Sequence, residues 1–145
     1  MSSKSKGNAF EVKVRKYLEA NGFTVDRARA TLKRLFIPGK APMFVSGAND
    51  FFGCADLVGV HPAKGYTLFV QCFASQDSGG LAHRKRKLEK IPWNLPTQRV
   101  QLWQTTKTRG HIKVHELLPV VGGDRAWVDE TFRPVTGEGA PVGIL

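Results

Sequence analysis

The stretch Tyr66-Thr-Leu-Phe-Val-Gln-Cys-Phe-Ala74 decides the fold that the sequence predicts. Apolar residues occupy both of its alternating sets of positions, which is typical of a central strand covered on both faces. Residues 54–60, Cys-Ala-Asp-Leu-Val-Gly-Val, form a second apolar stretch, and His61-Pro-Ala-Lys-Gly65 indicates a turn between the two. We therefore expect two consecutive strands joined by this turn, the second of them central in a sheet.

Helical periodicity is found on both sides of these strands. Residues 8–21 place their apolar side chains on one face, and Asn21-Gly22 is typical of a helix end. A basic helix is expected from about residue 81 to residue 91, because Pro92 ends it. Further strands are expected at residues 23–29, 99–104 and 112–117. This order predicts an α/β protein with a mixed central sheet flanked by helices.

Three segments fall outside this pattern. Residues 1–7 are polar and basic, and we expect them to form an N-terminal arm. Residues 31–49 hold two prolines and two glycines, which indicates an ordered loop. Residues 118–145 predict no particular element, and we interpret them as a C-terminal extension of the same domain. A chain of 145 residues is long enough for one domain with a buried core.

The net charge of +10 is large for this length, and the basic residues are clustered. Residues 1–40 hold ten Lys and Arg against three acids, and residues 81–110 hold eight against one. Solubility alone does not require such clustering, whereas binding of a polyanion does, because Lys and Arg neutralise phosphates. The sequence thus favours a nucleic-acid partner.

Cysteine usage and hydropathy suggest a compartment. Cys54 and Cys72 have no paired spacing and lie in apolar stretches, which suits a reducing environment. No stretch approaches the length of a membrane span, and the first residues lack the apolar segment of a signal peptide. We expect a cytoplasmic protein with no membrane partner.

Two polar residues stand in the apolar strands. Alternation puts Asp56 on the same strand face as Val58, where a carboxylate is costly unless it is paired. It is either a metal ligand or catalytic acid, or a strand-end residue that caps a turn or pairs with an Arg. Gln71 shares a face with Phe69 and Phe73. Its amide oxygen is either a ligand for a hard cation or a hydrogen-bond partner of a neighbouring loop.

The two helices carry further candidates. Glu11 lies at the border of the buried face of the first helix, where it is either a ligand or, three residues after Asn8, the acid of a capping interaction. In the second helix, Arg84 falls on the apolar stripe and Lys87 at its edge, so both are expected to lean toward the sheet, whereas Arg86 points away.

In order, these features resemble the PD-(D/E)XK nuclease superfamily, and in particular the archaeal-type and phage Holliday-junction resolvases. The resemblance covers roughly residues 4–117. It rests on the order of four short stretches: Lys6-Gly-Asn-Ala-Phe-Glu11, Gly22-Phe-Thr-Val-Asp-Arg27, Asp50-Phe-Phe-Gly-Cys-Ala-Asp56 and Leu68-Phe-Val-Gln-Cys-Phe-Ala-Ser75. It implies a restriction-endonuclease-like αβββαβ core at residues 8–117, a homodimer, and cleavage of four-way or branched DNA.

The resemblance also implies roles for individual residues. Mg²⁺, for which Mn²⁺ is expected to substitute, would be held by Glu11, Asp56, Gln71 and, as an outer or second-metal ligand, Asp50. Gln71 stands where the family has its second acid, and Phe73 stands where it has its lysine. Lys87, with Arg84, is the expected substitute, so that the catalytic set is Glu11, Asp56, Gln71 and Lys87. The residues expected to bind DNA are Lys4, Lys6, Arg15, Arg27, Arg29, Arg84 and Lys85.

Other functions remain open at this stage. The missing Glu and Lys would suit a DNA-binding protein with a degenerate, inactive nuclease fold. A nuclease of the same superfamily with another DNA substrate would share every feature described. An RNA-binding protein fits the charge, but the sequence shows no recognisable single-strand binding signature.

Overall fold

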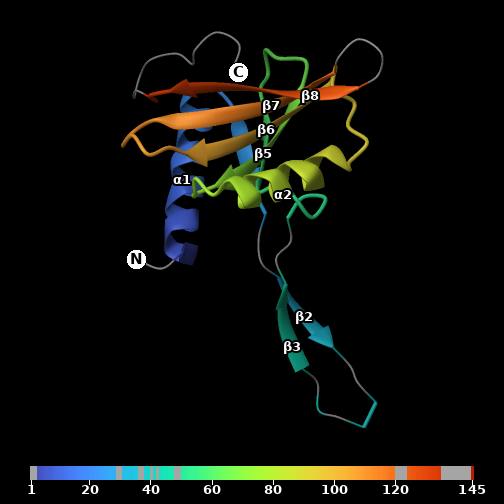
Figure 1. Ribbon diagram of the computed structural model, residues 1–145. Helices are drawn as coiled ribbons and strands as arrows, with labels where there is room; N and C mark the ends of the chain where they lie inside the picture. Colours follow the sequence, from blue (N-terminus) through green and yellow to red (C-terminus); the bar gives the residue numbers. More distant parts are fainter. Residues whose placement is uncertain are drawn as a thin grey trace.

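A six-stranded mixed sheet with a helix on each face forms the body of the protein (Figure 1). The computed structural model describes residues 3–28, 31–35, 38–39, 41, 43–47, 50–119, 124–134 and 145. Across the sheet the strands are, in order, β1 (Thr24–Arg27), β4 (Leu57–Val60), β5 (Thr67–Phe73), β6 (Gln98–Thr105), β7 (Ile112–Pro119) and β8 (Arg125–Phe132). The prediction of an α/β protein with a mixed sheet is confirmed.

The strand β5 lies inside the sheet, as its sequence predicts. It pairs antiparallel with β4, with Leu57 opposite Val70, and parallel with β6, with Gln71 opposite Leu102. A parallel pair needs a crossover connection, and α2 (Ser78–Glu89) provides it. The other neighbouring strands are antiparallel.

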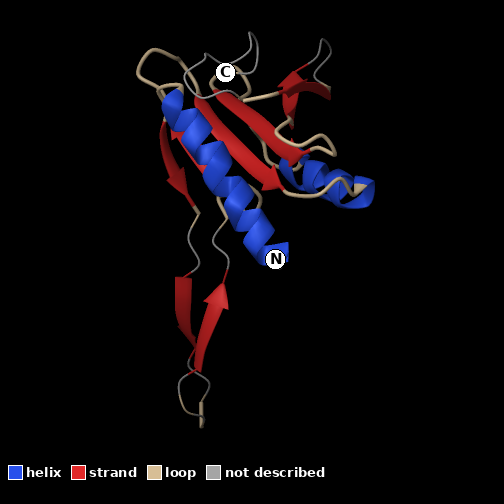
Figure 2. Ribbon diagram, turned by 90° about the vertical axis from the view of Figure 1, so that its left-hand side faces the viewer, coloured by secondary structure: helices blue, strands red, loops and turns tan. Residues whose placement is uncertain are grey.

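The two helices cover opposite faces of the sheet. The helix α1 (Ser3–Ala20) crosses one face, where Phe10, Val14 and Leu18 are buried in a cluster that includes Trp103 (Figure 2). Beneath α2, Leu88 joins the second cluster, which contains Phe69, Phe73 and Trp93. Among the helices that the structure describes, none is both long and apolar enough to cross a membrane.

Several element limits differ from the expectations. The first helix begins at Ser3 rather than residue 8, so the described part of the expected arm is helical. Apolar periodicity marks only the packed part of a helix, and residues 3–7 contain no proline that would end it earlier. The strand expected at residues 54–60 begins only at Leu57, because a turn closed by the Phe51–Ala55 bridge precedes it.

The expected loop at residues 31–49 contains a second, two-stranded sheet. Its strands β2 (Thr31–Leu35) and β3 (Met43–Gly47) are antiparallel, and they extend away from the body in both views (Figures 1 and 2). Both prolines, at positions 38 and 42, fall between the two strands in the sequence, so they interrupt neither strand. The unassigned C-terminal segment contributes β8 to the edge of the main sheet.

The end of α1 provides a test of this fold. Gly22 has φ +91°, and an added Cβ would lie 2.5 Å from Nε2 of His61. The His61 ring is itself held against Phe23, with ring centroids 5.2 Å apart. We expect Gly22→Ala to lower the free energy of unfolding by about 1–3 kcal/mol in urea denaturation.

Gly7→Ala is the matched control for this variant. Gly7 lies within α1 and has nothing within 4 Å of an added Cβ, so alanine there should raise stability by about 0.5–1 kcal/mol. Equal effects of the two substitutions would contradict the close approach of Gly22 to His61.

Candidate active site

Asp56 lies immediately before β4, where its backbone is held between two other strands. Its N–H donates to the carbonyl of Val70 at 2.8 Å, and its carbonyl accepts from the N–H of Ala28 at 2.8 Å. The side chain is partly buried, and its Oδ2 accepts two further hydrogen bonds from β5. These come from the backbone N–H of Cys72 at 2.8 Å and from Nε2 of Gln71 at 3.0 Å.

Gln71 is therefore a partner of Asp56. Its Nε2 also lies 3.4 Å from the carbonyl of Cys72. No residue that the structure describes donates a hydrogen bond to its Oε1. The amide thus keeps its acceptor oxygen available while its nitrogen fixes the carboxylate of Asp56. The sequence left open whether Gln71 is a metal ligand or a hydrogen-bond partner of a neighbouring loop. In the structure its hydrogen-bond partner is Asp56, which is itself a candidate ligand.

Burial and neighbouring acids disfavour the ionised form of Asp56. Burial is the main cause that raises its pKa from 3.8 to about 6. The Cys72 N–H opposes the rise, the carboxylates of Asp50 and Glu11 add to it, and the guanidinium of Arg84 lowers it. Charged residues of both helices, Glu11 on α1 and Arg84 on α2, therefore influence the pKa of Asp56.

Glu11 and Asp50 complete the acidic cluster without touching Asp56. Burial raises the pKa of Glu11, Arg27 lowers it and Asp50 raises it again. The Oε1 of Glu11 lies 3.5 Å from Nε of Arg27. Because α1 begins at Ser3, Glu11 is in its third turn, and the capping interaction considered for it does not exist. Asp50 accepts the Gly53 N–H through its backbone carbonyl, in the turn before Asp56.

Of the two basic side chains of α2 that are expected to lean toward the sheet, Arg84 does so, whereas Lys87 is exposed. The guanidinium of Arg84 lies 4.1 Å from the ring centroid of Phe73. The prediction that Arg84 leans toward the sheet is confirmed. Lys87 is exposed, yet its charge lowers the pKa of the Cys54 thiol, which burial and Asp50 raise. Arg86 is exposed, as its helical phase predicts.

The remaining basic candidates lie at different places. Lys6 is exposed on α1, and Arg15 pairs with Glu19 at 2.8 Å. Lys85 lies on the other side of α2, with its Nζ 5.3 Å from the Trp127 ring centroid. Lys4 is in α1 and Arg27 in β1, whereas the side chain of Lys4 and the whole of Arg29 lie outside the described residues.

The predicted metal ligands are all oxygen donors, which suits a hard cation such as Mg²⁺. Of the four, only Asp56 and Gln71 are in direct contact. Within the described ranges, no group of three or more His, Cys, Asp or Glu side chains is close enough to hold a metal ion. The structure thus brings Asp56, Gln71, Glu11 and Asp50 to one end of the sheet. The four side chains are not arranged closely enough to coordinate one metal ion.

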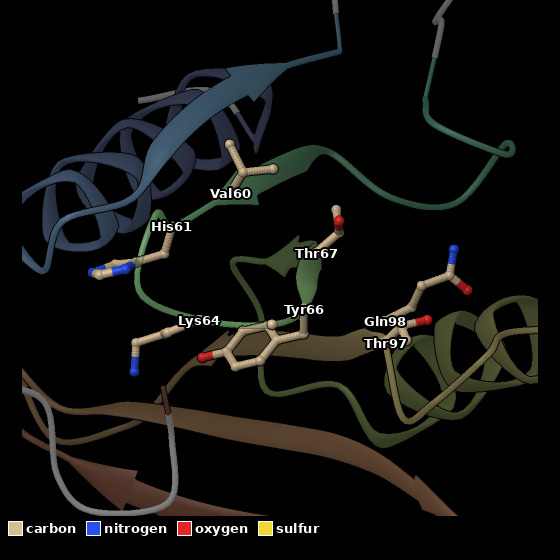
Figure 3. A pocket seen from close by; sticks show the side chains of 8 residues that line it. Val60, His61, Lys64, Tyr66, Thr67, Thr97 and Gln98 are labelled. Carbon is tan, nitrogen blue, oxygen red and sulfur yellow. The ribbon is translucent and has the colours of Figure 1, made fainter.

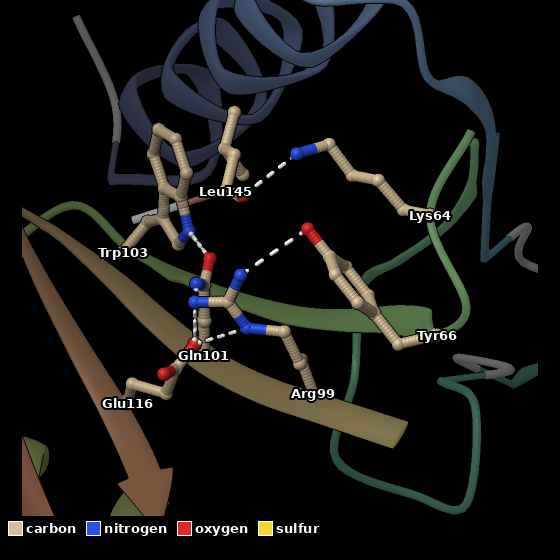
Figure 4. Close-up of polar contacts among 7 residues, drawn as sticks. All are labelled: Lys64, Tyr66, Arg99, Gln101, Trp103, Glu116 and Leu145. Carbon is tan, nitrogen blue, oxygen red and sulfur yellow. Dashed lines mark hydrogen bonds and ion pairs between the residues drawn. The ribbon is translucent and has the colours of Figure 1, made fainter. Parts of the chain in front are cut away.

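A second polar cluster shows what a purely structural arrangement looks like in this protein. On the α1 face, Gln101 donates to Glu116 at 2.7 Å and accepts from the indole N–H of Trp103 at 2.9 Å (Figure 4). Arg99 forms an ion pair with Glu116 and donates to the hydroxyl of Tyr66 at 3.2 Å. Here the acid forms a direct ion pair with a base, whereas the direct partners of Asp56 are an amide and a backbone N–H, and two further acids raise its pKa.

The cavity in Figure 3 lies away from these acids. It has a volume of about 420 Å³ and is lined by residues around the β4–β5 turn, among them His61, Lys64 and Tyr66. None of the described residues that line it is an acid. The cavity is at the far end of β4 and β5 from Asp56, so it is not the site of the predicted chemistry.

Sequence reasoning missed Phe52 and Trp93, which lie beside the site. The two rings are 5.5 Å apart, and Phe52 is 62 % exposed. The sequence feature that indicates Phe52 is the stretch Asp50-Phe-Phe-Gly53, in which two consecutive aromatic residues precede a turn glycine. No sequence signal brought Trp93 to it, because their contact depends on how the turn packs against the end of α2.

Comparison of the chain with protein-family models, curated protein sequences and solved structures finds no match. The function is therefore argued from the geometry of the site and from the charge of the protein.

The raised pKa of Asp56 predicts a specific pH dependence of stability. The pKa of Asp56 is about 6 in the folded protein, whereas the ordinary pKa of an aspartate, expected in the unfolded chain, is 3.8. Ionisation of Asp56 therefore favours the unfolded chain, and stability is lost as the pH rises from about 4 to about 6. Asparagine can accept both hydrogen bonds without ionising. We expect Asp56→Asn to unfold like the wild type below pH 4 and to be up to about 3 kcal/mol more stable at pH 7.5, measured by denaturant titration.

Asp26→Asn is the control, because Asp26 is exposed on β1. In a protein with a net charge of +10, removal of an exposed acid should not stabilise the fold. A loss of stability in Asp56→Asn at pH 7.5 would contradict the argument that its neighbours disfavour the carboxylate.

Proposed function

We propose that this protein is a metal-dependent endonuclease that cleaves phosphodiester bonds in branched DNA, as the Holliday-junction resolvases do. The observation that carries the proposal is the partly buried carboxylate of Asp56, whose pKa two nearby acids raise and which Gln71 holds at the end of paired strands. Carboxylates with perturbed pKa values are concentrated at functional sites, where burial and neighbouring charges tune them for metal binding or catalysis. In a protein of charge +10, such a cluster suits a cation that bridges protein and phosphate.

The order of the elements supports the same proposal at the level of fold. In sequence, α1, β1, β4, β5, α2 and β6 follow the αβββαβ order of a restriction-endonuclease-like core, and β2–β3 is an insertion after β1. Glu11, Asp56 and Gln71 lie on the first helix, before the second core strand and on the third, as the resemblance implies. Fold alone does not establish an activity, so the site must carry the argument.

The residues fit a hard divalent cation such as Mg²⁺ by their chemistry. Asp56, Glu11 and the Oε1 of Gln71 would hold it, with Asp50 as a further acid. When bound, the cation would activate water and polarise the phosphoryl oxygen. In the structure Arg27 pairs with Glu11, and Gln71 keeps the carboxylate of Asp56 in one orientation.

Arg84 is the better supported substitute for the lysine that the family pattern places at position 73. Its guanidinium lies over the ring of Phe73 itself, 4.1 Å from the centroid, and its charge acts on Asp56. There it can orient a phosphate and stabilise negative charge that develops during hydrolysis. Lys87 is exposed one helical turn further on and would contact the DNA backbone nearby.

A DNA-binding protein without catalytic activity is the second candidate function. The observation that favours it is the direct bond between Gln71 and Asp56, because it satisfies the carboxylate without any metal. Cleavage and binding by the same preparation separate the two functions. Branched and linear substrates then separate junction cleavage from other nuclease activities.

Substitution of Asp56 is the first test of catalysis. We expect Asp56→Asn to cleave a labelled four-way junction about 100-fold or more slowly in Mg²⁺, because a ligand charge is lost. Its affinity for the junction in EDTA should be unchanged or slightly higher, because one carboxylate near the phosphates is removed.

Wild-type protein with the junction and with a linear duplex of the same sequence serves as the reference. Activity of Asp56→Asn within a few-fold of the wild type would remove Asp56 from the catalytic set. Junction binding by the wild type without any cleavage in Mg²⁺ or Mn²⁺ would establish the non-catalytic alternative.

Gln71→Glu tests the metal site without relying on activity. The substitution replaces the N–H donor 3.0 Å from the Asp56 carboxylate by a second carboxylate, which should lower the melting temperature in EDTA. Added Mg²⁺ should restore much of the loss, because a cation between two carboxylates removes their repulsion. Thermal melts of wild type and variant with and without Mg²⁺ measure this.

Gln101→Glu is the matched control, because it places a carboxylate beside Glu116 in a cluster with no expected metal. It should show no recovery in Mg²⁺. Loss of stability in Gln71→Glu that Mg²⁺ does not restore would mean that Gln71 is only a buried amide.

A further inference from the structure

Phe52 has a backbone conformation that is costly for its residue type. Its φ is +55°, and among the described residues it is the one non-glycine residue with a positive φ. A bulky side chain in this region is rare, and such strain persists only where the surrounding structure imposes it. The side chain is nevertheless 62 % exposed, so the strain does not serve to bury it.

The turn around Phe52 imposes this conformation. The Phe51 N–H donates to Ala55 at 2.8 Å, the Gly53 N–H to Asp50 at 3.1 Å and the Cys54 N–H to Phe51 at 3.1 Å. Phe51, Cys54 and Ala55 pack inward against the cluster under α2. With its neighbours held in this way, Phe52 projects outward at the tip of a closed turn.

Two other aromatic rings support the Phe52 side chain from below. Its centroid lies 5.7 Å from Phe69 and 5.5 Å from Trp93, and the latter contact is edge-to-face at 87°. Phe69 and Trp93 are both buried and lie 4.8 Å apart. The exposed ring is therefore held in place by a rigid aromatic base, which lowers the entropy cost of contacting a ligand.

The position of Phe52 relates it to the candidate active site. It lies two residues after Asp50 and four before Asp56, in the turn that carries both acids. The charge of Lys87 reaches Cys54 in the same turn. The exposed ring belongs to the turn that links Asp50 to Asp56. A DNA strand whose phosphates bind at these acids would bring its bases within reach of this turn.

We propose that Phe52 is a stacking platform for an unpaired DNA base next to the scissile phosphate, an inference that rests on the proposed function. The bases of a linear duplex are covered on both faces by their neighbours, whereas a branch point or bulge leaves a base face open. An aromatic side chain stacks on any open base, independent of sequence. Phe52 would thus supply preference for branched or unpaired DNA, while the basic residues bind phosphates of either substrate.

The test compares a bulged duplex with a continuous duplex, with 2-aminopurine at the bulge and at the equivalent paired position, in Ca²⁺ without Mg²⁺. We expect the wild type to prefer the bulged duplex and to quench its 2-aminopurine fluorescence. Phe52→Ala should lose about fivefold to 100-fold in affinity for the bulged duplex and most of the quenching. Its affinity for the continuous duplex should stay within about twofold. Phe52→Trp should retain both preference and quenching.

Two further variants keep the test decisive. Phe52→Gly lacks the ring but adopts a positive φ without strain, so it should fold even if Phe52→Ala does not. Val60→Ala is the control for an exposed apolar residue, because Val60 is 50 % exposed at the other end of β4. It should bind both DNAs like the wild type.

The outcomes separate this inference from the proposed function. Equal losses for bulged and continuous DNA in the Phe52 variants, or no preference in the wild type, would overturn the stacking role and leave the nuclease proposal standing. Absence of binding to any DNA would overturn both. A preference for bulged DNA that survives Phe52→Gly would assign the recognition of unpaired bases to other residues.

Discussion

Strand β5 contributes Leu68 and Val70 to the cluster under α1 and Phe69 and Phe73 to the cluster under α2. Its burial on both faces fixes the strand between the two helical layers. The end of the strand, where Gln71 and Cys72 lie, is fixed with it. Asp56 can accept from both of these residues only because β4 and β5 are held in register. The position of the candidate site therefore depends on the packing of one central strand.

The site has features that oppose stability locally. Asp56 is partly buried with two acids nearby, and Phe52 adopts a conformation that a glycine would adopt at lower cost. The cluster around Glu116 shows that this fold can bury an acid with a balancing base. Local costs of this kind are expected at functional sites, and in this protein they occur at the end of the sheet where the proposed site lies.

The proposed activity depends on residues that differ from the nuclease pattern at two positions, Gln71 and Phe73. An amide in place of an acid lowers the negative charge offered to a cation. In the proposed site, the guanidinium of Arg84, which lies over an aromatic ring, would take the place of the lysine in the nuclease pattern. Arg has a planar, bidentate geometry toward phosphates and a fixed positive charge, so it suits orientation and charge stabilisation better than proton transfer. A nuclease built in this way would depend on its metal and on positioning of the substrate.

The sequence by itself determined the α/β class, the two consecutive strands with the second inside the sheet, the phase of Arg84 on α2 and the basic character of the protein. These features follow from local periodicity and composition, which neighbouring residues carry without help from the rest of the chain. It also identified Asp56 and Gln71 as polar residues out of place in apolar strands. It did not determine the start of α1, where no apolar stripe marks the helix, or the β2–β3 hairpin, whose prolines suggested a loop.

Only the tertiary structure decided how the candidates meet. The bond between Gln71 and Asp56 spans 15 residues, and the pairing of Glu11 with Arg27 joins α1 to β1. The strained backbone of Phe52 results from the packing of its neighbours and from hydrogen bonds that close the turn. Contacts of this kind depend on register and on the docking of whole elements. The physical reason is that the free energy of a long-range contact is shared among all the elements that hold it, so no single stretch of sequence records it.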